Sequence, residues 1–159
     1  MRHLGCFPLL FVTLTACAPN HDESSDAATG RDVRAFAATV AHDITRDGPT
    51  AWRRFFPNSP DFYMVSDGVL AFPDGESAAK GIDALPSMIK QITLEWSDIR
   101  VDPLGPGLAS MGAHFHELRS APNGSRTEES GYFTAVVDSH NGRWQFRNAH
   151  WSTPRPETH

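Results

Sequence analysis

The stretch GYFTAVVDSHNGRWQFRNAHWS, residues 131–152, decides the fold. Two segments rich in aromatic and β-branched residues flank Asn141-Gly142, a pair that is typical of a tight hairpin turn. The pattern therefore predicts two antiparallel strands, over residues 128–139 and 143–152, close to the C-terminus.

Two further strands are predicted immediately upstream. Residues 93–105 and 108–120 each contain strand-forming residues, and short turns rich in glycine, proline and asparagine separate the segments. Consecutive strands joined by short turns form an antiparallel meander. The C-terminal half of the chain is therefore expected to be a sheet.

The residues before this meander alternate between helical and hairpin patterns. Apolar side chains recur at helical spacing at Val33, Phe36, Ala37, Val40 and Ile44. A short second helix is expected over 50–56, a hairpin over 61–72 and a loop over 73–81. A third helix is expected to begin near Asp83, because Pro86 is tolerated only in a first helical turn. Helices, a hairpin and a meander together predict an α+β fold.

Three segments in this order resemble the NTF2-like superfamily, which includes SnoaL-like and ketosteroid-isomerase-like domains. They are VSDGVLAFPDGESAAKGIDAL (65–85), PLGPGLASMGAHF (103–115) and GYFTAVVDSHNGRWQFRNAHWS (131–152), and the resemblance covers about residues 31–153. It implies a cone-shaped roll in which about three helices pack in a strongly curved antiparallel sheet of about six strands. It also implies an interior pocket that the last strand lines.

Strand alternation places Trp144, Phe146, Asn148, His150 and Ser152 on one face of the last strand. The resemblance implies that this face lines the cavity, so Asn148 and His150 are expected to supply its polar groups. The alternative is that His150 is a core histidine hydrogen-bonded to a buried neighbour.

The function expected first is the binding of a small, largely apolar molecule, without a cofactor. Aromatic and polar candidates line the expected pocket: Trp52, Phe56, Tyr63, Trp96, Asn148 and His150. Another hypothesis is that the domain is an assembly module, which forms a homodimer through the open face of the sheet.

The alternative of another class is a cofactor-free isomerase, dehydratase or cyclase. His150 would be its acid or base, with Asp67 and Asp98 as weaker candidates, and Tyr63 or Tyr132 would donate a hydrogen bond. The catalytic carboxylate of ketosteroid isomerases and SnoaL cyclases has no definite counterpart in this sequence, which counts against those specific chemistries.

The charge and the positions of the histidines argue against two classes of partner, nucleic acids and metal ions. The net charge is −5, and no basic run is present, so a nucleic-acid partner is not expected. His114 and His116 have the spacing of a metal-binding pair on one strand face, but the alternate row on that strand is the more apolar one. No metal is therefore expected, and whether these histidines face the pocket or solvent stays open.

The N-terminus has the layout of an export signal. A mostly apolar run, residues 4–16, follows a basic start and ends in Leu-Thr-Ala-Cys17, which resembles the bacterial lipobox. We predict a signal peptide over 1–16, a lipid-anchored flexible tether over 17–30 and a flexible tail over 154–159. Membrane attachment in the cell envelope follows from acylation of Cys17, at the outer membrane or periplasmic face in a Gram-negative host. The alternative is a plain signal peptide with an incidental Cys17.

Overall fold

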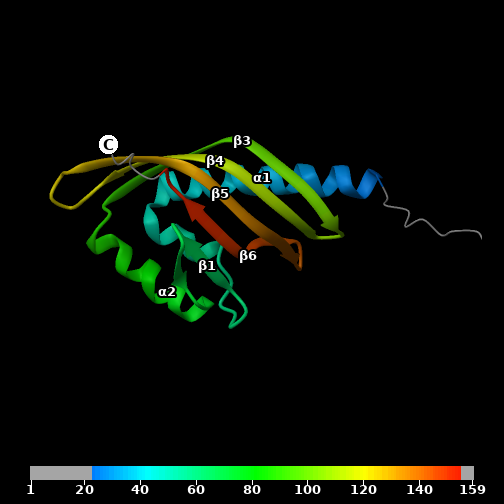
Figure 1. Ribbon diagram of the computed structural model, residues 1–159, viewed down its shortest axis with the longest axis horizontal. Helices are drawn as coiled ribbons and strands as arrows, with labels where there is room; N and C mark the ends of the chain where they lie inside the picture. The colour runs from blue at the N-terminus through cyan, green and yellow to red at the C-terminus, as the bar shows by residue number, and fades with distance from the viewer. Residues whose placement is uncertain (1–22, 155–159) are drawn as a thin grey trace, which may run out of the picture.

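The computed structural model describes residues 23–154, which form an α+β fold (Figure 1). The elements in chain order are α1 (Glu23–Asp47), the 3-10 helix η1 (Pro49–Arg54), β1 (Tyr63–Ser66), β2 (Val69–Phe72), α2 (Gly75–Ala84), the 3-10 helix η2 (Leu85–Ser87), β3 (Gln91–Gly105), β4 (Leu108–Ser120), β5 (Arg126–His140) and β6 (Arg143–Ser152). The expected fold class is confirmed, and the second expected helix is the 3-10 helix η1.

The six strands form one sheet in the order β2-β1-β6-β5-β4-β3. The meander β3 to β6 and the hairpin β1–β2 are antiparallel, as expected, whereas β1 pairs with β6 in parallel. The sheet is therefore mixed, which corrects the expectation of a wholly antiparallel sheet. The reason is that the early hairpin docks beside the last strand, with Tyr63 opposite Asn148 and Ser66 opposite Trp151.

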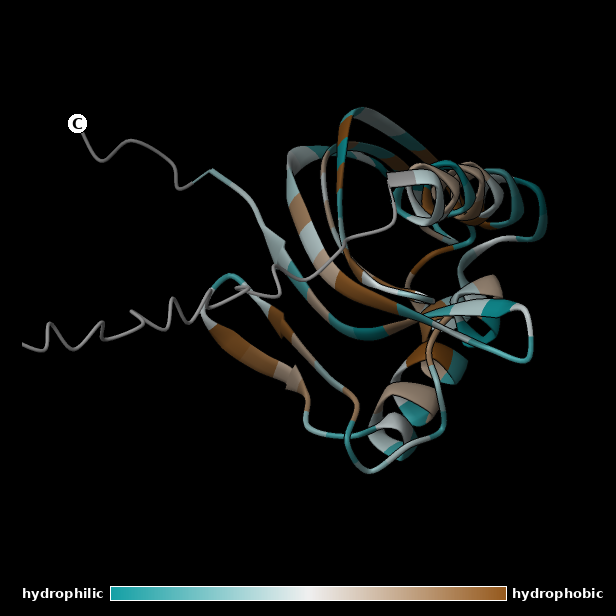
Figure 2. Cartoon of the chain, turned by 90° about the vertical axis from the view of Figure 1, so that its right-hand side faces the viewer, coloured by the Kyte–Doolittle hydropathy of each residue, from teal (hydrophilic) through white to brown (hydrophobic). Residues whose placement is uncertain are grey.

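The core lies between α1 and the concave face of the sheet. Figure 2, which looks along α1, shows the strands curving around the helical layer. All five apolar residues predicted to share one face of this helix are at most 8% exposed. They meet the inward rows of β4 and β5, which include Met111, Phe115, Phe133 and Val137. Removing this apolar surface from water is the main stabilising contribution to the fold.

The first helix begins earlier than the sequence predicted. Helix α1 starts at Glu23, so residues 23–30 of the expected tether are helical, and Thr29 and Gly30 are buried. The polar segment therefore continues the amphipathic helix. The predicted signal peptide, Cys17 and the predicted tail from residue 155 on lie outside the described residues. Within residues 23–154, no helix combines the length and apolar character needed to cross a bilayer.

Helix α2 corrects the expectation of a loop over 73–81 and a helix from Asp83. Asp74 caps the helix, because its side chain accepts a hydrogen bond of 2.7 Å from the backbone N–H of Ser77. Gly75 allows a close approach, since a Cβ there would lie 2.2 Å from the carbonyl oxygen of Pro57. Pro86 lies in the following 3-10 turn η2.

A β-bulge in β6 inverts the expected alternation of its side chains. Val136 pairs with Asn148, but the next residue, Val137, pairs with Phe146, so Arg147 is an extra residue. Phe146 and Ala149 consequently face the core, at 0% and 2% exposure.

The bulge overturns the prediction that Trp144, Asn148 and His150 share a face. Asn148 and His150 still share one, but it is the outer face of the sheet, and His150 is exposed. Phe146 is buried as predicted, whereas Trp144 is only partly buried against the core.

Candidate functional site

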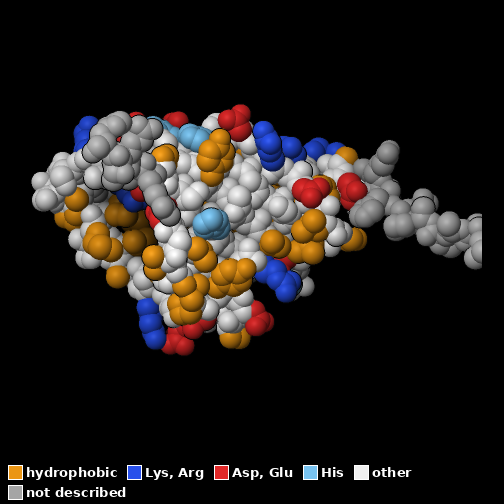
Figure 3. Space-filling view, in the orientation of Figure 1, with side chains coloured by type: hydrophobic (Ala, Val, Ile, Leu, Met, Phe, Trp, Pro, Cys, Tyr) orange, Lys and Arg blue, Asp and Glu red, His pale blue; other side chains and the backbone are white. Residues whose placement is uncertain are grey.

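A cavity of about 180 Å³ opens between the helical layer and the concave face of the sheet. Its walls come from η1 and the turn after it, the hairpin β1–β2, the end of α2, η2, and strands β4 and β6. The lining side chains are Trp52, Phe56, Met64, Ser66, Phe72, Ile82, Leu85, Glu117, Arg119 and Trp151. Figure 3 shows hydrophobic side chains around a hollow that lies above α2 in that view.

Stacked aromatic rings form the apolar wall. Trp52 and Phe56 are one helical turn apart, and their ring centroids lie 5.5 Å apart at 15°. Trp151 of β6 meets Trp52 edge-on, with centroids 5.8 Å apart. Two of the sequence candidates, Trp52 and Phe56, therefore line this cavity, and Trp151 joins them. Trp151 was not among the candidates selected from the sequence, because without the bulge it would face away from the pocket.

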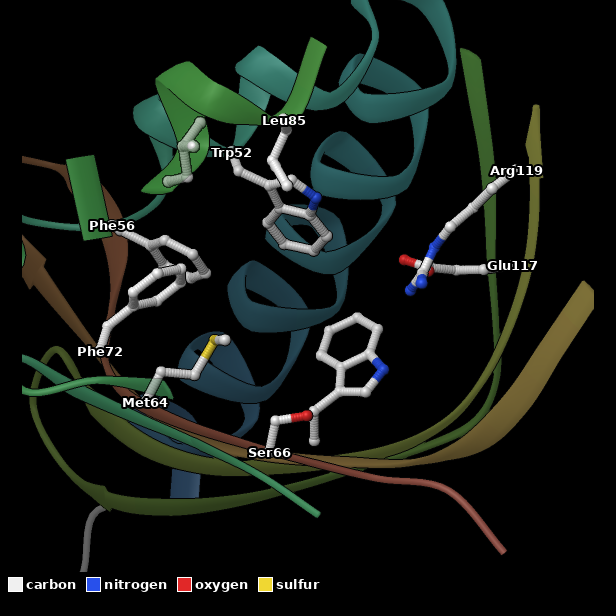
Figure 4. A pocket seen from close by; sticks show the side chains of 10 residues that line it. Trp52, Phe56, Met64, Ser66, Phe72, Leu85, Glu117 and Arg119 are labelled. Atoms are coloured by element: carbon white, nitrogen blue, oxygen red, sulfur yellow. The ribbon is translucent and has the colours of Figure 1, made fainter. Parts of the chain in front are cut away.

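Two charged side chains from β4 form the opposite wall, Glu117 and Arg119. Figure 4 shows both across the cavity from Trp52, Phe56 and Phe72, with the Glu117 carboxylate directed into the space. The carboxylate is 2% exposed. Arg119 donates from Nε to Glu117 Oε2 at 2.6 Å and also from Nη2 to the same oxygen. The same Nη2 lies 2.8 Å from Oε2 of Glu129, the residue opposite Glu117 on β5.

Burial raises the pKa of the Glu117 carboxyl above its ordinary range, and the positive charge of Arg119 opposes that rise. The neighbouring carboxylate of Glu129 adds a smaller increase in the pKa. A buried acid of this kind beside a cavity is a candidate for acid–base work or for ligand binding. Glu117 was not among the candidates selected from the sequence. One feature of the sequence could have identified it: Glu117 is an acid in the alternating row of β4 that otherwise contains apolar residues such as Ala113 and Phe115.

The indole N–H of Trp151 is buried without a hydrogen-bond acceptor among the described residues, and the same holds for Trp96. Most buried N–H groups in proteins have an acceptor. Trp96 packs against Phe133 and Trp151, behind the cavity wall, and is not one of its lining residues.

Three other sequence candidates meet on the outer face of the sheet. Tyr63, Asn148 and His150 line a shallow groove with Val65 and Thr134. Asn148 has a structural role there, because its Oδ1 accepts a 3.2 Å hydrogen bond from the backbone N–H of Val136. The expected placement of Tyr63, Asn148 and His150 in the apolar pocket is therefore wrong.

The remaining acid–base candidates are spread over the surface. Tyr132 is 63% exposed and packs edge-on against His114. Asp67 accepts hydrogen bonds from the backbone and side chain of Thr153, and Asp98 occupies a bulge of β3 with a φ of 51°. His150 and the two tyrosines therefore lie on the outer face of the sheet, and none of them lines the apolar cavity.

The histidine pair of β4 faces outward, alternating with the buried row. His116 Nε2 lies 2.8 Å from Glu128 Oε1, and His114 Nδ1 lies 3.4 Å from Ser97 Oγ. Over residues 23–154, no three His, Cys, Asp or Glu side chains are grouped in a way that could hold a metal ion.

Several solved structures share this architecture. An NTF2-like superfamily protein from Salmonella enterica matches with a TM-score of 0.69 and 15% identity, over 83% of this chain and 95% of that one. A provisionally assigned scytalone dehydratase from Novosphingobium aromaticivorans matches with a TM-score of 0.68 and 12% identity, over 79% and 83%. A type 2 hexachlorocyclohexane dehydrochlorinase, LinA, matches with a TM-score of 0.59 and 10% identity, over 76% and 81%.

These likenesses define the class of the domain: an α+β protein with the NTF2-like fold. Neither a protein-family model nor a curated protein matches the sequence. One fold hosts many functions, so the residues of the site, and not the fold, indicate what the domain does.

Proposed function

We propose that this domain binds a small, largely apolar molecule in the cavity between η1, α2 and the concave face of the sheet. The observation that carries the proposal is an aromatic cavity with a few polar groups gathered on one wall. Binding sites for small molecules have this composition. The cavity volume, about 180 Å³, is similar to the roughly 150 Å³ of an engineered cavity that holds benzene. The ligand is therefore of the size of one substituted ring.

Filling the cavity tests this proposal. Leu85 lines the cavity, so Leu85→Trp should occupy it and lower the affinity of the full chain for toluene by more than tenfold. Met88 is close in sequence but 59% exposed and outside the lining, so Met88→Trp is the matched control and should bind toluene like the wild type. Calorimetric titration measures the affinities, and thermal melts check folding. Equal toluene affinity in the wild type and the folded Leu85→Trp variant would refute the proposal.

A second candidate function, cofactor-free acid–base catalysis, is favoured by Glu117. A buried carboxyl whose pKa is raised can exchange a proton with a substrate in an apolar site. In this version of the isomerase, dehydratase or cyclase hypothesis, Glu117 replaces His150 as the acid or base. Native mass spectrometry after incubation with cell extract separates the two functions. A ligand recovered unchanged supports binding, and one converted by the wild type but not by Glu117→Gln supports catalysis.

We also propose that the domain is held at the cell envelope through a lipid on Cys17. The support is the apolar run before Leu-Thr-Ala-Cys17 and its resemblance to the lipobox. Cys17→Ala should move the chain from the membrane pellet to the soluble fraction or leave it unprocessed, as fractionation and intact mass will show. The proposal fails if the variant is processed and anchored like the wild type.

A further inference from the structure

We propose that the ligand of this cavity carries a hydroxyl group, held between the indole N–H of Trp151 and the carboxylate of Glu117. This inference rests on the proposed function and adds the chemical class of the ligand. The inference follows from one donor and one acceptor at the cavity, the indole N–H of Trp151 and Oε1 of Glu117, which make no hydrogen bond among the described residues.

Trp151 supplies the donor. Its ring lies among Phe115, Phe133 and Trp52, with the Phe115 centroid at 4.5 Å, and this packing fixes the indole in place. Phe115 precedes Glu117 by two residues in the same inward row, so the indole lies next to the charged wall of the cavity. The Trp151 N–H has no acceptor among the described residues, and a buried donor without an acceptor is unfavourable. A ligand that brings an oxygen acceptor removes this penalty.

Glu117 supplies the acceptor. Both hydrogen bonds from Arg119 go to Oε2, which leaves Oε1 without a donor from the described residues. A carboxylate oxygen directed into an apolar cavity binds best to a ligand group that carries a hydrogen.

The charges around Glu117 argue against an anionic ligand. One guanidinium, Arg119, serves two carboxylates, those of Glu117 and Glu129, so the ionised cluster has a net charge of −1. A ligand carboxylate would add a second uncompensated negative charge in a poorly solvated place. An ammonium group would suit Glu117, but it has no acceptor to offer Trp151. A hydroxyl both donates and accepts, and it is neutral.

Four single-ring probes of similar size separate these alternatives: toluene, phenol, benzylamine and benzoate. The full chain, carrying nitrogen-15, is titrated with each probe while the indole N–H signals of its four tryptophans are followed by NMR. Trp151→Phe identifies the signal of Trp151. We expect phenol to bind about tenfold more tightly than toluene, benzylamine and benzoate, and to shift the Trp151 indole proton downfield as it gains an acceptor. In Trp151→Phe, the preference for phenol over toluene should fall about fivefold or more.

The outcomes distinguish this inference from the function on which it rests. If toluene binds as tightly as phenol, or if benzylamine or benzoate binds best, the hydroxyl assignment is wrong and the cavity remains a binding site. A phenol preference that survives in Trp151→Phe overturns the role of Trp151. If none of the four probes binds, the proposed function itself fails.

Discussion

At the scale of single residues, the site depends on a carboxyl in an apolar row. Glu117 follows Met111, Ala113 and Phe115 on the inward side of β4 and is as buried as they are. A buried carboxylate without a partner would be costly, and Arg119 offsets part of that cost through two hydrogen bonds to one oxygen. The pair stabilises less than its geometry suggests, because burial raises the pKa of Glu117 despite the arginine.

The raised pKa predicts how stability depends on pH. Between the ordinary pKa of a glutamate, 4.5, and the higher value in the folded state, the folded chain binds a proton that the unfolded chain has lost. The contribution of Glu117 is therefore fully present below pH 4.5 and is lost as the pH rises through the folded pKa. Glu117→Gln cannot ionise, so its free energy of unfolding should fall less than that of the wild type between pH 4.5 and 8.

Urea unfolding at several pH values measures this difference. Glu76→Gln, which changes a carboxylate that is 73% exposed on α2, is the matched control and should parallel the wild type. A difference between Glu117→Gln and the wild type that stays constant with pH would show that Glu117 does not change ionisation on folding.

At the scale of elements, the sequence predicts correctly those helices and strands in which the apolar pattern repeats over many residues. The helical face of Val33 to Ile44 and the strands of the meander form as expected, because a buried face repeats at a fixed spacing. Helix α2 was not predicted, because its segment, residues 75–84, contains two glycines and few large apolar residues. Its start depends on the Asp74 cap and on Gly75 lying against Pro57, a contact distant in sequence.

The bulge in β6 determines which side chains of this strand face the candidate site. Strict alternation placed His150 inside, and one extra residue at Arg147 moved it outside and brought Trp151 into the cavity. A bulge leaves little signal in a single sequence, since Arg147 would be acceptable on any exposed strand. Two of the four aromatic lining residues, Trp52 and Phe56, were predictable from helical spacing, whereas the polar wall required the strand register.

At the scale of the whole molecule, the cavity lies between the helical layer and the concave face of the sheet. Helix α1 fills the concave face of the sheet along β3 and β4, while η1 and α2 cover the part near β1 and β6 (Figure 1). Parallel pairing of β1 with β6 brings Met64 and Ser66 of the hairpin to the cavity that Trp151 lines. Residues far apart in the sequence meet there, so the site as a whole could not be read from local patterns.

The central claim is that the small-molecule site lies inside, between the helices and the sheet, and not on the outer face around His150. Nuclear Overhauser contacts from bound toluene to the methyl groups of the isotopically labelled full chain test it most directly. We predict contacts to the methyl groups of Met64, Ile82 and Leu85, which line the cavity. Contacts to Val65 and Thr134 instead, in the groove beside His150, would contradict the account.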